Sequence, residues 1–171
     1  MNSKKTVVIA TGGTGGHIFP SLSLADFLCK EYEIEIFTDE RGSKFLQSDQ
    51  SFKIKKIVSS RIFSRNIFSI LSGFFKFFIS LLFSIKLLIK IKPKLIIGMG
   101  GYSSFPVCLS GYLLKIPIII YENNLVIGRA NKFLLPLSKK ILVSNESIEG
   151  IKKKYKNKIF VSGYQDTVEI N

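Results

Sequence analysis

Short apolar runs alternate along the chain with longer segments of helical pattern. Runs rich in β-branched residues and bounded by Gly, Pro or charge are typical of buried strands. They predict strands at residues 6–10, 34–38, 54–58, 95–98, 116–121 and 141–144. Helices are predicted between them at residues 18–30, 66–91, 105–115, 128–137 and 146–154. Strands that are apolar on both faces and alternate with helices predict an α/β fold, a doubly wound parallel sheet covered on each side.

The predicted helix at residues 66–91 is unusually apolar. Residues 67–85 contain a single charged side chain and meet the length criterion for a membrane span. On a helical wheel, however, the Ser, Gly and Lys residues of this helix fall within an arc of roughly 160°. In a helix that spans a membrane there is no reason for these residues to lie on one side. In a helix that lies between a sheet and a lipid surface there is such a reason. The pattern favours a surface-docked amphipathic helix over a true span or an ordinary core helix.

Composition and charge indicate which kind of molecule this protein binds. A length of 171 residues with 46% hydrophobic content predicts one packed domain. The net charge is +13, and residues 51–121 contain eleven Lys and Arg but no Asp or Glu. Such a surface attracts nucleic acid, an anionic membrane face or a phosphorylated substrate. Biased base composition in the gene would add lysine, but it does not readily explain an acid-free block.

The cysteines and the N-terminus indicate a reducing compartment. Cys29 and Cys108 are too few and too far apart for a metal site or a disulfide framework, so both are expected to be buried thiols. The apolar run near the N-terminus has about five residues, too few for the core of a signal peptide. A cytoplasmic location is therefore expected.

Three unusual loops follow predicted strands: GGTGGH at residues 12–17, GMGGYSSFP at residues 98–106, and the segment ENNLVIGRANK at residues 122–132. In doubly wound sheets ligands bind at the carboxyl ends of the strands, so these loops are expected to converge on one cleft. The first loop lacks the lysine of a GxxxxGK[ST] loop and fits GxGxxG in no register. The absent dinucleotide fingerprint argues against a nicotinamide-dependent oxidoreductase.

Several polar residues in these loops are candidates for chemistry. His17, the only histidine, can serve as a general base toward a sugar hydroxyl, or it can cap the helix or donate to a loop carbonyl. Two helix N-termini at the first two loops can hold a pyrophosphate. Glu122 ends an apolar strand and either binds a ligand or joins neighbouring loops. Asn123 and Asn124 either bind sugar hydroxyls or form an ordinary turn.

The segments ATGGTGGHIFPSLSLA, KPKLIIGMGGYSSFPV and IPIIIYENNLVIGRANK resemble, in order and spacing, the motifs of the MurG family of N-acetylglucosaminyltransferases. The resemblance implies that residues 1–163 form the acceptor-binding, Rossmann-like amino-terminal half of a GT-B glycosyltransferase. Residues 164–171 are expected to be a divergent tail, because SGYQDTVEIN replaces the family's Gly-Asn-Pro-x-Arg segment and lacks its arginine. The resemblance implies that the carboxy-terminal donor domain is absent from this chain.

The implied activity is an inverting, metal-independent transfer that needs no cofactor. N-acetylglucosamine would pass from UDP-GlcNAc to undecaprenyl-pyrophosphoryl-MurNAc-pentapeptide, the step from lipid I to lipid II in peptidoglycan synthesis. The implied location is peripheral, on the cytoplasmic face of the inner membrane, with no nucleic acid as partner. The alternative is a non-catalytic membrane-docking subunit of a split glycosyltransferase that recruits a separate donor-domain chain.

The resemblance also implies residue roles, position by position. His17 matches the histidine favoured as general base. The implied donor contacts are Thr14, Gly15, Gly16 and Asn124; the implied acceptor contacts are Gly100, Gly101, Tyr102, Ser103 and Glu122; the expected membrane contacts are Phe74, Phe75, Phe78 and Leu82.

Overall fold

The computed structural model describes residues 4–13, 15–45, 52–58, 67–145 and 147–162. The strands are β1 (Thr6–Ala10), β2 (Glu33–Thr38), β3 (Lys53–Lys56), β4 (Leu95–Gly98), β5 (Ile118–Glu122), β6 (Lys140–Val143) and β7 (Ile159–Val161). The α-helices are α1 (Gly15–Leu28), α2 (Glu40–Ser43), α3 (Ile67–Ile91), α4 (Ser104–Leu113) and α5 (Arg129–Leu134), followed by a 3-10 helix, η1 (Lys153–Lys158).

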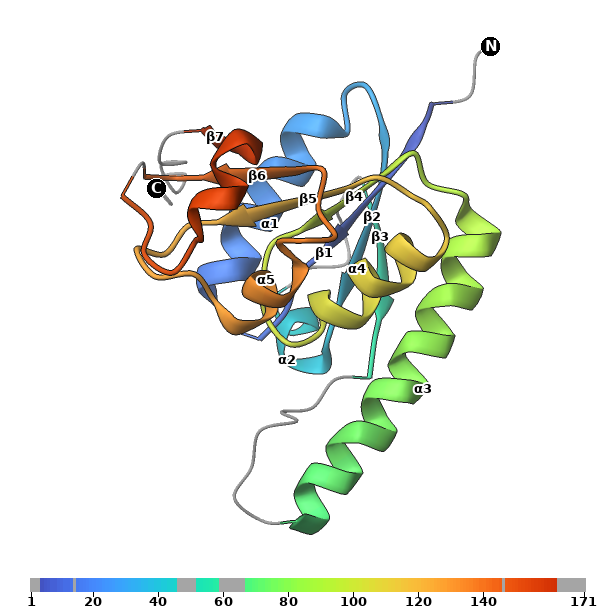
Figure 1. The fold of residues 1–171 in the computed structure, drawn as a ribbon. Coiled ribbons are helices and arrows are strands. Elements are labelled where there is room, and N and C mark those ends of the chain that lie inside the picture. The colour runs from blue at the N-terminus through green and yellow to red at the C-terminus, as the bar shows by residue number, and fades with distance from the viewer. Residues whose placement is uncertain (1–3, 14, 46–51, 59–66, 146, 163–171) are drawn as a thin grey trace.

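The seven strands form one parallel sheet in the order β3-β2-β1-β4-β5-β6-β7, which confirms the predicted fold class (Figure 1). Strand β1 lies between β2 and β4, so Val8 pairs with Glu35 on one side and with Ile96 on the other. The direction of winding reverses at this point, so α1 after β1 and α4 after β4 cover opposite faces of the sheet. A crevice at such a reversal is where open α/β sheets bind ligands.

The core has two layers, because successive side chains of a strand point to opposite faces of the sheet. On one face, Ile9 and Ile36 belong to a buried cluster with Ala25 of α1. On the other face, Val8 lies in a cluster with residues of α3, α4 and α5. Both faces are therefore covered, as the apolar strands predict.

Helix α3 packs on α4, where the rings of Phe77 and Phe105 stack with their centres 5.6 Å apart. Gly73, Ser80 and Ser84 are buried, and the Ser110 hydroxyl of α4 donates to the Leu81 carbonyl over 3.1 Å. The helical wheel had grouped these small residues with the lysines as one polar side. In the structure Gly73, Ser80 and Ser84 are buried, while Lys76 and the other lysines of α3 are exposed.

The outer side of α3 carries large apolar side chains, and its amino-terminal half extends past the sheet (Figure 1). The exposed apolar residues, called here the α3 apolar face, are Leu71, Phe74, Phe75, Phe78, Ile79, Leu82, Phe83 and Ile89. Within the part of the chain that the structure describes, no helix combines the length and hydropathy needed to cross a membrane.

The predicted helix at residues 146–154 is wrong over residues 147–154, whereas residue 146 lies outside the described residues. The Glu149 N–H donates to the Leu125 carbonyl over 2.8 Å, and the Glu149 carbonyl accepts from the Ile127 N–H over 3.0 Å. These backbone groups are thus committed to a β-bridge with the loop after β5, and Gly150 then turns at a φ of +88°. The sequence prediction also missed α2, η1 and β7.

The two cysteines differ. Cys108 is fully buried, and burial raises the pKa of its thiol to about 12, as expected of an inert core cysteine. Cys29 lies just after α1 and is only partly buried, so the expectation of two buried thiols is wrong for this residue. Its thiol donates to the Asp26 carbonyl in the last turn of the helix.

Candidate functional site

The three loops converge, as predicted, on a pocket of about 290 Å³ at the carboxyl ends of the strands. One wall comes from His17 in the first turn of α1, and a second comes from the loop after β4. The loop after β5 and the start of α5 complete it. The lining residues are His17, Gly100, Gly101, Tyr102, Glu122, Asn124, Gly128, Arg129, Ala130 and Asn131.

The loops after β1 and β4 pack backbone against backbone, which requires glycine. Gly101 has a φ of +83°, and a Cβ atom there would lie 2.4 Å from the Gly12 carbonyl oxygen. Gly100 has a φ of +92°, and its Cβ would lie 2.9 Å from Cε1 of His17. The Ser103 hydroxyl is buried and donates to the Thr11 carbonyl over 2.9 Å. This hydrogen bond favours a structural role for the Ser103 side chain over a direct acceptor contact.

Asp39 stabilises the first loop through a hydrogen bond to its backbone, a role that the sequence did not predict. Its Oδ1 accepts from the Gly13 N–H over 3.3 Å and from the Gly42 N–H over 2.9 Å. Its Oδ2 forms an ion pair with Arg41 at 2.8 Å. The available signal was an acid directly after a buried strand. Since the Gly13 N–H already donates to a carboxylate, it is not directed at a ligand phosphate.

His17 lies in the first turn of α1 with its ring beside Gly100. Its backbone carbonyl accepts from the Ser21 hydroxyl over 2.6 Å and from the Thr11 hydroxyl over 3.2 Å. Nδ1 of the ring is buried and has no hydrogen-bond partner among the described residues. Burial lowers the pKa of His17, although the charge of Glu122 and the backbone carbonyl of Met99 oppose this effect. Burial therefore favours the neutral ring, the form that can accept a proton.

We expect the pKa of His17 to lie below its ordinary value of 6.5 in the folded protein. Because the folded state then binds its proton less readily than the unfolded state, the neutral ring favours folding above about pH 6.5 and this contribution is lost as the pH falls. The chain has one histidine, so its Cε1–H resonance can be followed by NMR from pH 8 to pH 4 without ambiguity. A midpoint at or above 6.5 would contradict this expectation, because it would mean that Glu122 and the Met99 carbonyl outweigh the effect of burial.

Glu122 holds the third loop together. Its Oε1 accepts from the backbone N–H and the side-chain amide of Asn124, over 3.1 and 2.6 Å. Its Oε2 accepts from the Gly128 N–H over 2.8 Å and from the Asn131 amide over 3.0 Å. Since Glu122 is 1% exposed and both oxygens are engaged, the joining role left open by the sequence is the one that the geometry supports. A direct ligand contact of Glu122 stays a prediction.

A hydrogen bond joins the third loop to the first. Pro20 lies inside α1 and has no N–H to donate to the carbonyl of Gly16, four residues earlier. The Asn123 amide donates to that carbonyl instead, over 2.9 Å. The proline thus frees an acceptor that ties the loop after β5 to the start of α1.

The other residues assigned from the resemblance are distributed around the pocket. Gly15 and Gly16 begin α1, and Tyr102 and Asn124 line the pocket, whereas Thr14 lies outside the described residues. Gly128 and Arg129 also line it and were not assigned a role from the sequence. Among the described residues, no group of three or more His, Cys, Asp and Glu could hold a metal ion.

Comparison with known proteins agrees with the resemblance. A curated relative from Rickettsia canadensis (strain McKiel) is 37% identical over 160 residues, which cover 93% of this chain and 44% of the relative. A relative from Pelagibacter ubique (strain HTCC1062) is 38% identical over 158 residues, 92% of this chain and 44% of the relative. Both are named UDP-N-acetylglucosamine--N-acetylmuramyl-(pentapeptide) pyrophosphoryl-undecaprenol N-acetylglucosamine transferase. The chain thus spans less than half the length of these relatives.

Solved structures support the same fold. MurG of Acinetobacter baumannii matches with a TM-score of 0.75 and 23% identity over 92% of this chain and 45% of that chain. A UDP-GlcNAc 2-epimerase from Methanocaldococcus jannaschii matches with a TM-score of 0.60 and 20% identity over 91% and 45%. These likenesses concern the fold alone, the amino-terminal half of a GT-B protein, because transferase and epimerase share it.

A match to a family model can distinguish a transferase from an epimerase, because such a match depends on the sequence and not on the fold. The model described as the glycosyltransferase family 28 N-terminal domain matches residues 7–143, which include all three loops. Because this match covers most of the 171 residues, the chain belongs to the glycosyltransferase family 28 N-terminal domain family.

Proposed function

We propose that the chain is the acceptor-binding half of an inverting glycosyltransferase that transfers N-acetylglucosamine from UDP-GlcNAc to undecaprenyl-pyrophosphoryl-MurNAc-pentapeptide. The observation that carries this proposal is the convergence of three family motifs on one pocket that contains His17. The relatives' names supply the donor and the acceptor. Residues 1–163 form the acceptor domain in this proposal, and most donor contacts come from the second domain of the GT-B fold.

His17 is the general base of the proposed reaction. The neutral ring takes the proton of the MurNAc 4-hydroxyl, whose oxygen forms a bond to the anomeric carbon of the donor sugar. The bond from that carbon to the UDP oxygen breaks, and UDP leaves with the electron pair. The negative charge of Glu122 favours the imidazolium that results, since it raises the pKa of His17. Gly100, Gly101 and Tyr102 contact the acceptor in this arrangement, and the start of α1 faces the donor.

The α3 apolar face is the proposed membrane contact. Phe74, Phe75, Phe78 and Leu82 are 52%, 69%, 56% and 65% exposed. Lys76 is exposed on the same helix. An exposed apolar face flanked by cations suits the surface of an anionic bilayer. The proposal places the protein at the cytoplasmic face of the inner membrane, where a lipid-linked acceptor is within reach.

Replacing Phe75 with aspartate should weaken binding to anionic phospholipid vesicles about tenfold or more, because a buried phenylalanine contributes roughly 1.5–3 kcal/mol of transfer free energy. Co-sedimentation with vesicles measures the effect. The matched control is Phe27→Asp, because Phe27 is equally exposed, at 69%, but belongs to α1 on the opposite face of the sheet. Equal losses in the two variants, or no loss with Phe75→Asp, would count against the α3 apolar face.

Acceptor binding tests the proposed function directly. The chain should bind vesicles that carry the lipid-linked muramyl-pentapeptide acceptor more tightly than the same vesicles without it. Equal binding to both would overturn the proposal.

With labelled UDP-GlcNAc, the chain alone should transfer little, since stabilisation of the leaving group belongs to the second domain. Robust transfer by the chain alone would refute this dependence.

The variant His17→Ala distinguishes the proposed glycosyltransferase from the alternative, a non-catalytic docking subunit. When the chain is combined with the carboxy-terminal domain of a curated relative, His17→Ala should lower transfer by about 100-fold or more if His17 is the base. Transfer that proceeds equally well with His17→Ala would favour the docking subunit that recruits a donor-domain chain.

A further inference from the structure

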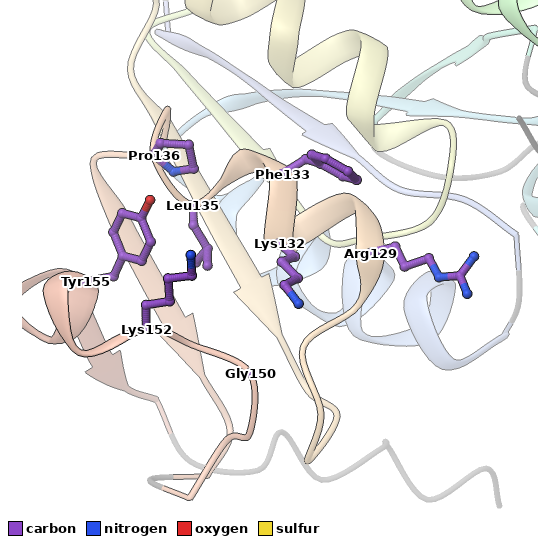
Figure 2. Close-up of a pocket in the computed structure, with 8 residues that line it drawn as sticks. All are labelled: Arg129, Lys132, Phe133, Leu135, Pro136, Gly150, Lys152 and Tyr155. Carbon is purple, nitrogen blue, oxygen red and sulfur yellow. The ribbon is translucent and has the colours of Figure 1, made fainter. Parts of the chain in front are cut away.

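A second cavity, of about 480 Å³, lies beside the candidate site between α5 and the segment at residues 150–155 (Figure 2). Its apolar lining comes from Phe133, Leu135, Pro136 and Tyr155. The volume is typical of small-ligand pockets, which span about 300–1,000 Å³. This cavity is called the α5 groove below.

The α5 groove is positively charged. Lys132 of α5 and Lys152 from the segment before η1 line it and are exposed, and none of the described residues that line it is acidic. Figure 2 shows these two side chains entering from different elements, on either side of Leu135. Nearby, Lys154 Nζ lies 5.0 Å from the centre of the Tyr155 ring, and Lys158 Nζ donates to the Ser138 carbonyl over 2.7 Å. Such a field favours carboxylates.

The α5 groove and the candidate site share a wall. Arg129, the first residue of α5, lines both cavities. In Figure 2 its side chain extends away from Lys132 and Lys152. A ligand whose sugar occupies the candidate site therefore meets the groove directly past Arg129. A branch attached to that sugar can follow α5 into it.

We propose that the α5 groove binds the peptide branch of the acceptor, with a peptide carboxylate between Lys132 and Lys152 and aliphatic side chains against the apolar lining. This inference rests on the proposed function, which gives the acceptor a pentapeptide. A peptide joined to the sugar through its amino end keeps a free carboxylate at its other end. Because Arg129 lines both cavities and the groove is positively charged, we expect the groove to bind a branch of the ligand in the candidate site and not a separate ligand.

The test compares three lipid-free probes by titration calorimetry: muramyl-pentapeptide pyrophosphate as the free acid, the same compound with a C-terminal amide, and peptide-free muramyl pyrophosphate. The wild-type chain should bind the free acid about tenfold more tightly than the amide, a difference of about 1.4 kcal/mol, and should bind the peptide-free probe least tightly. The double variant Lys132→Glu with Lys152→Glu should lose this preference. Its binding of the peptide-free probe should change much less.

The matched control is Lys30→Glu with Lys94→Glu, which changes the net charge equally at exposed positions near the opposite end of the sheet. It should keep the preference for the free acid, and thermal melts should show both double variants folded. An unchanged preference in the groove variant, or no preference in the wild type, would overturn the inference while binding of the peptide-free probe still supports the proposed function. If the wild type binds none of the probes, the proposed function fails and the inference falls with it.

Discussion

Replacing Gly101 with alanine is expected to lower the free energy of unfolding by about 3–5 kcal/mol, one of the two largest effects anticipated in this molecule. The φ of +83° is costly for any residue with a Cβ. The new methyl group would also lie 2.4 Å from the oxygen and 2.9 Å from the carbonyl carbon of Gly12. These are backbone atoms that cannot rotate away. Chemical denaturation of the purified variant measures the loss.

Gly12 is itself closely packed, since a Cβ at Gly12 would lie 1.7 Å from the Ser103 hydroxyl oxygen. The matched control is Gly128→Ala in the same pocket. Gly128 has a φ of −64°, and the nearest atom to its Cβ would be Glu122 Oε2 at 3.4 Å. The control should change stability by no more than about 0.5 kcal/mol. Similar losses at Gly101 and Gly128 would mean that the two loops do not pack as described.

The sequence was sufficient to predict strands β1 to β6 of the sheet and the edge at which the three loops meet. Strand prediction succeeded where β-branched runs are buried on both faces, as in β1 and β4. Convergence of the loops follows from topology, because parallel strands bring their carboxyl ends to one edge. His17 and Glu122 were therefore assigned to the same pocket although 105 positions separate them in the chain.

What the sequence could not predict depends on contacts between distant segments. The hydrogen bonds from Ser103 to Thr11 and from Asn123 to Gly16 have no local signature, because each residue type suits an ordinary turn equally well. The predicted helix at residues 146–154 failed for the same reason, since a β-bridge to Val126 outweighed local helical preference. For α3, the periodicity of the sequence placed the Ser, Gly and Lys residues on one side of the helix. It did not show that Ser80 and Ser84 are buried against the protein.

Replacing Glu122 with glutamine should cost about 2–4 kcal/mol of stability although the side chain keeps its shape. The carboxylate accepts four hydrogen bonds through two oxygens, whereas the amide nitrogen of glutamine is a donor. Whichever way the amide turns, two of the four donors lose their acceptor, and the amide nitrogen is brought against them at a position that is 1% exposed. Loss of the negative charge should also lower the pKa of His17 further, because Glu122 is the charge that raises it.

The two consequences of Glu122→Gln are measured separately, by chemical denaturation and by the NMR titration of the single histidine. The control is Glu149→Gln, at an exposed position where only the backbone is engaged with the loop after β5, and it should leave both quantities nearly unchanged. A variant at Glu122 that is less stable but has an unchanged pKa of His17 would separate the loop-holding role from the electrostatic one. A variant with unchanged stability would contradict the hydrogen bonds themselves, because a side chain buried at position 122 cannot exchange an acceptor for a donor opposite two N–H groups without cost.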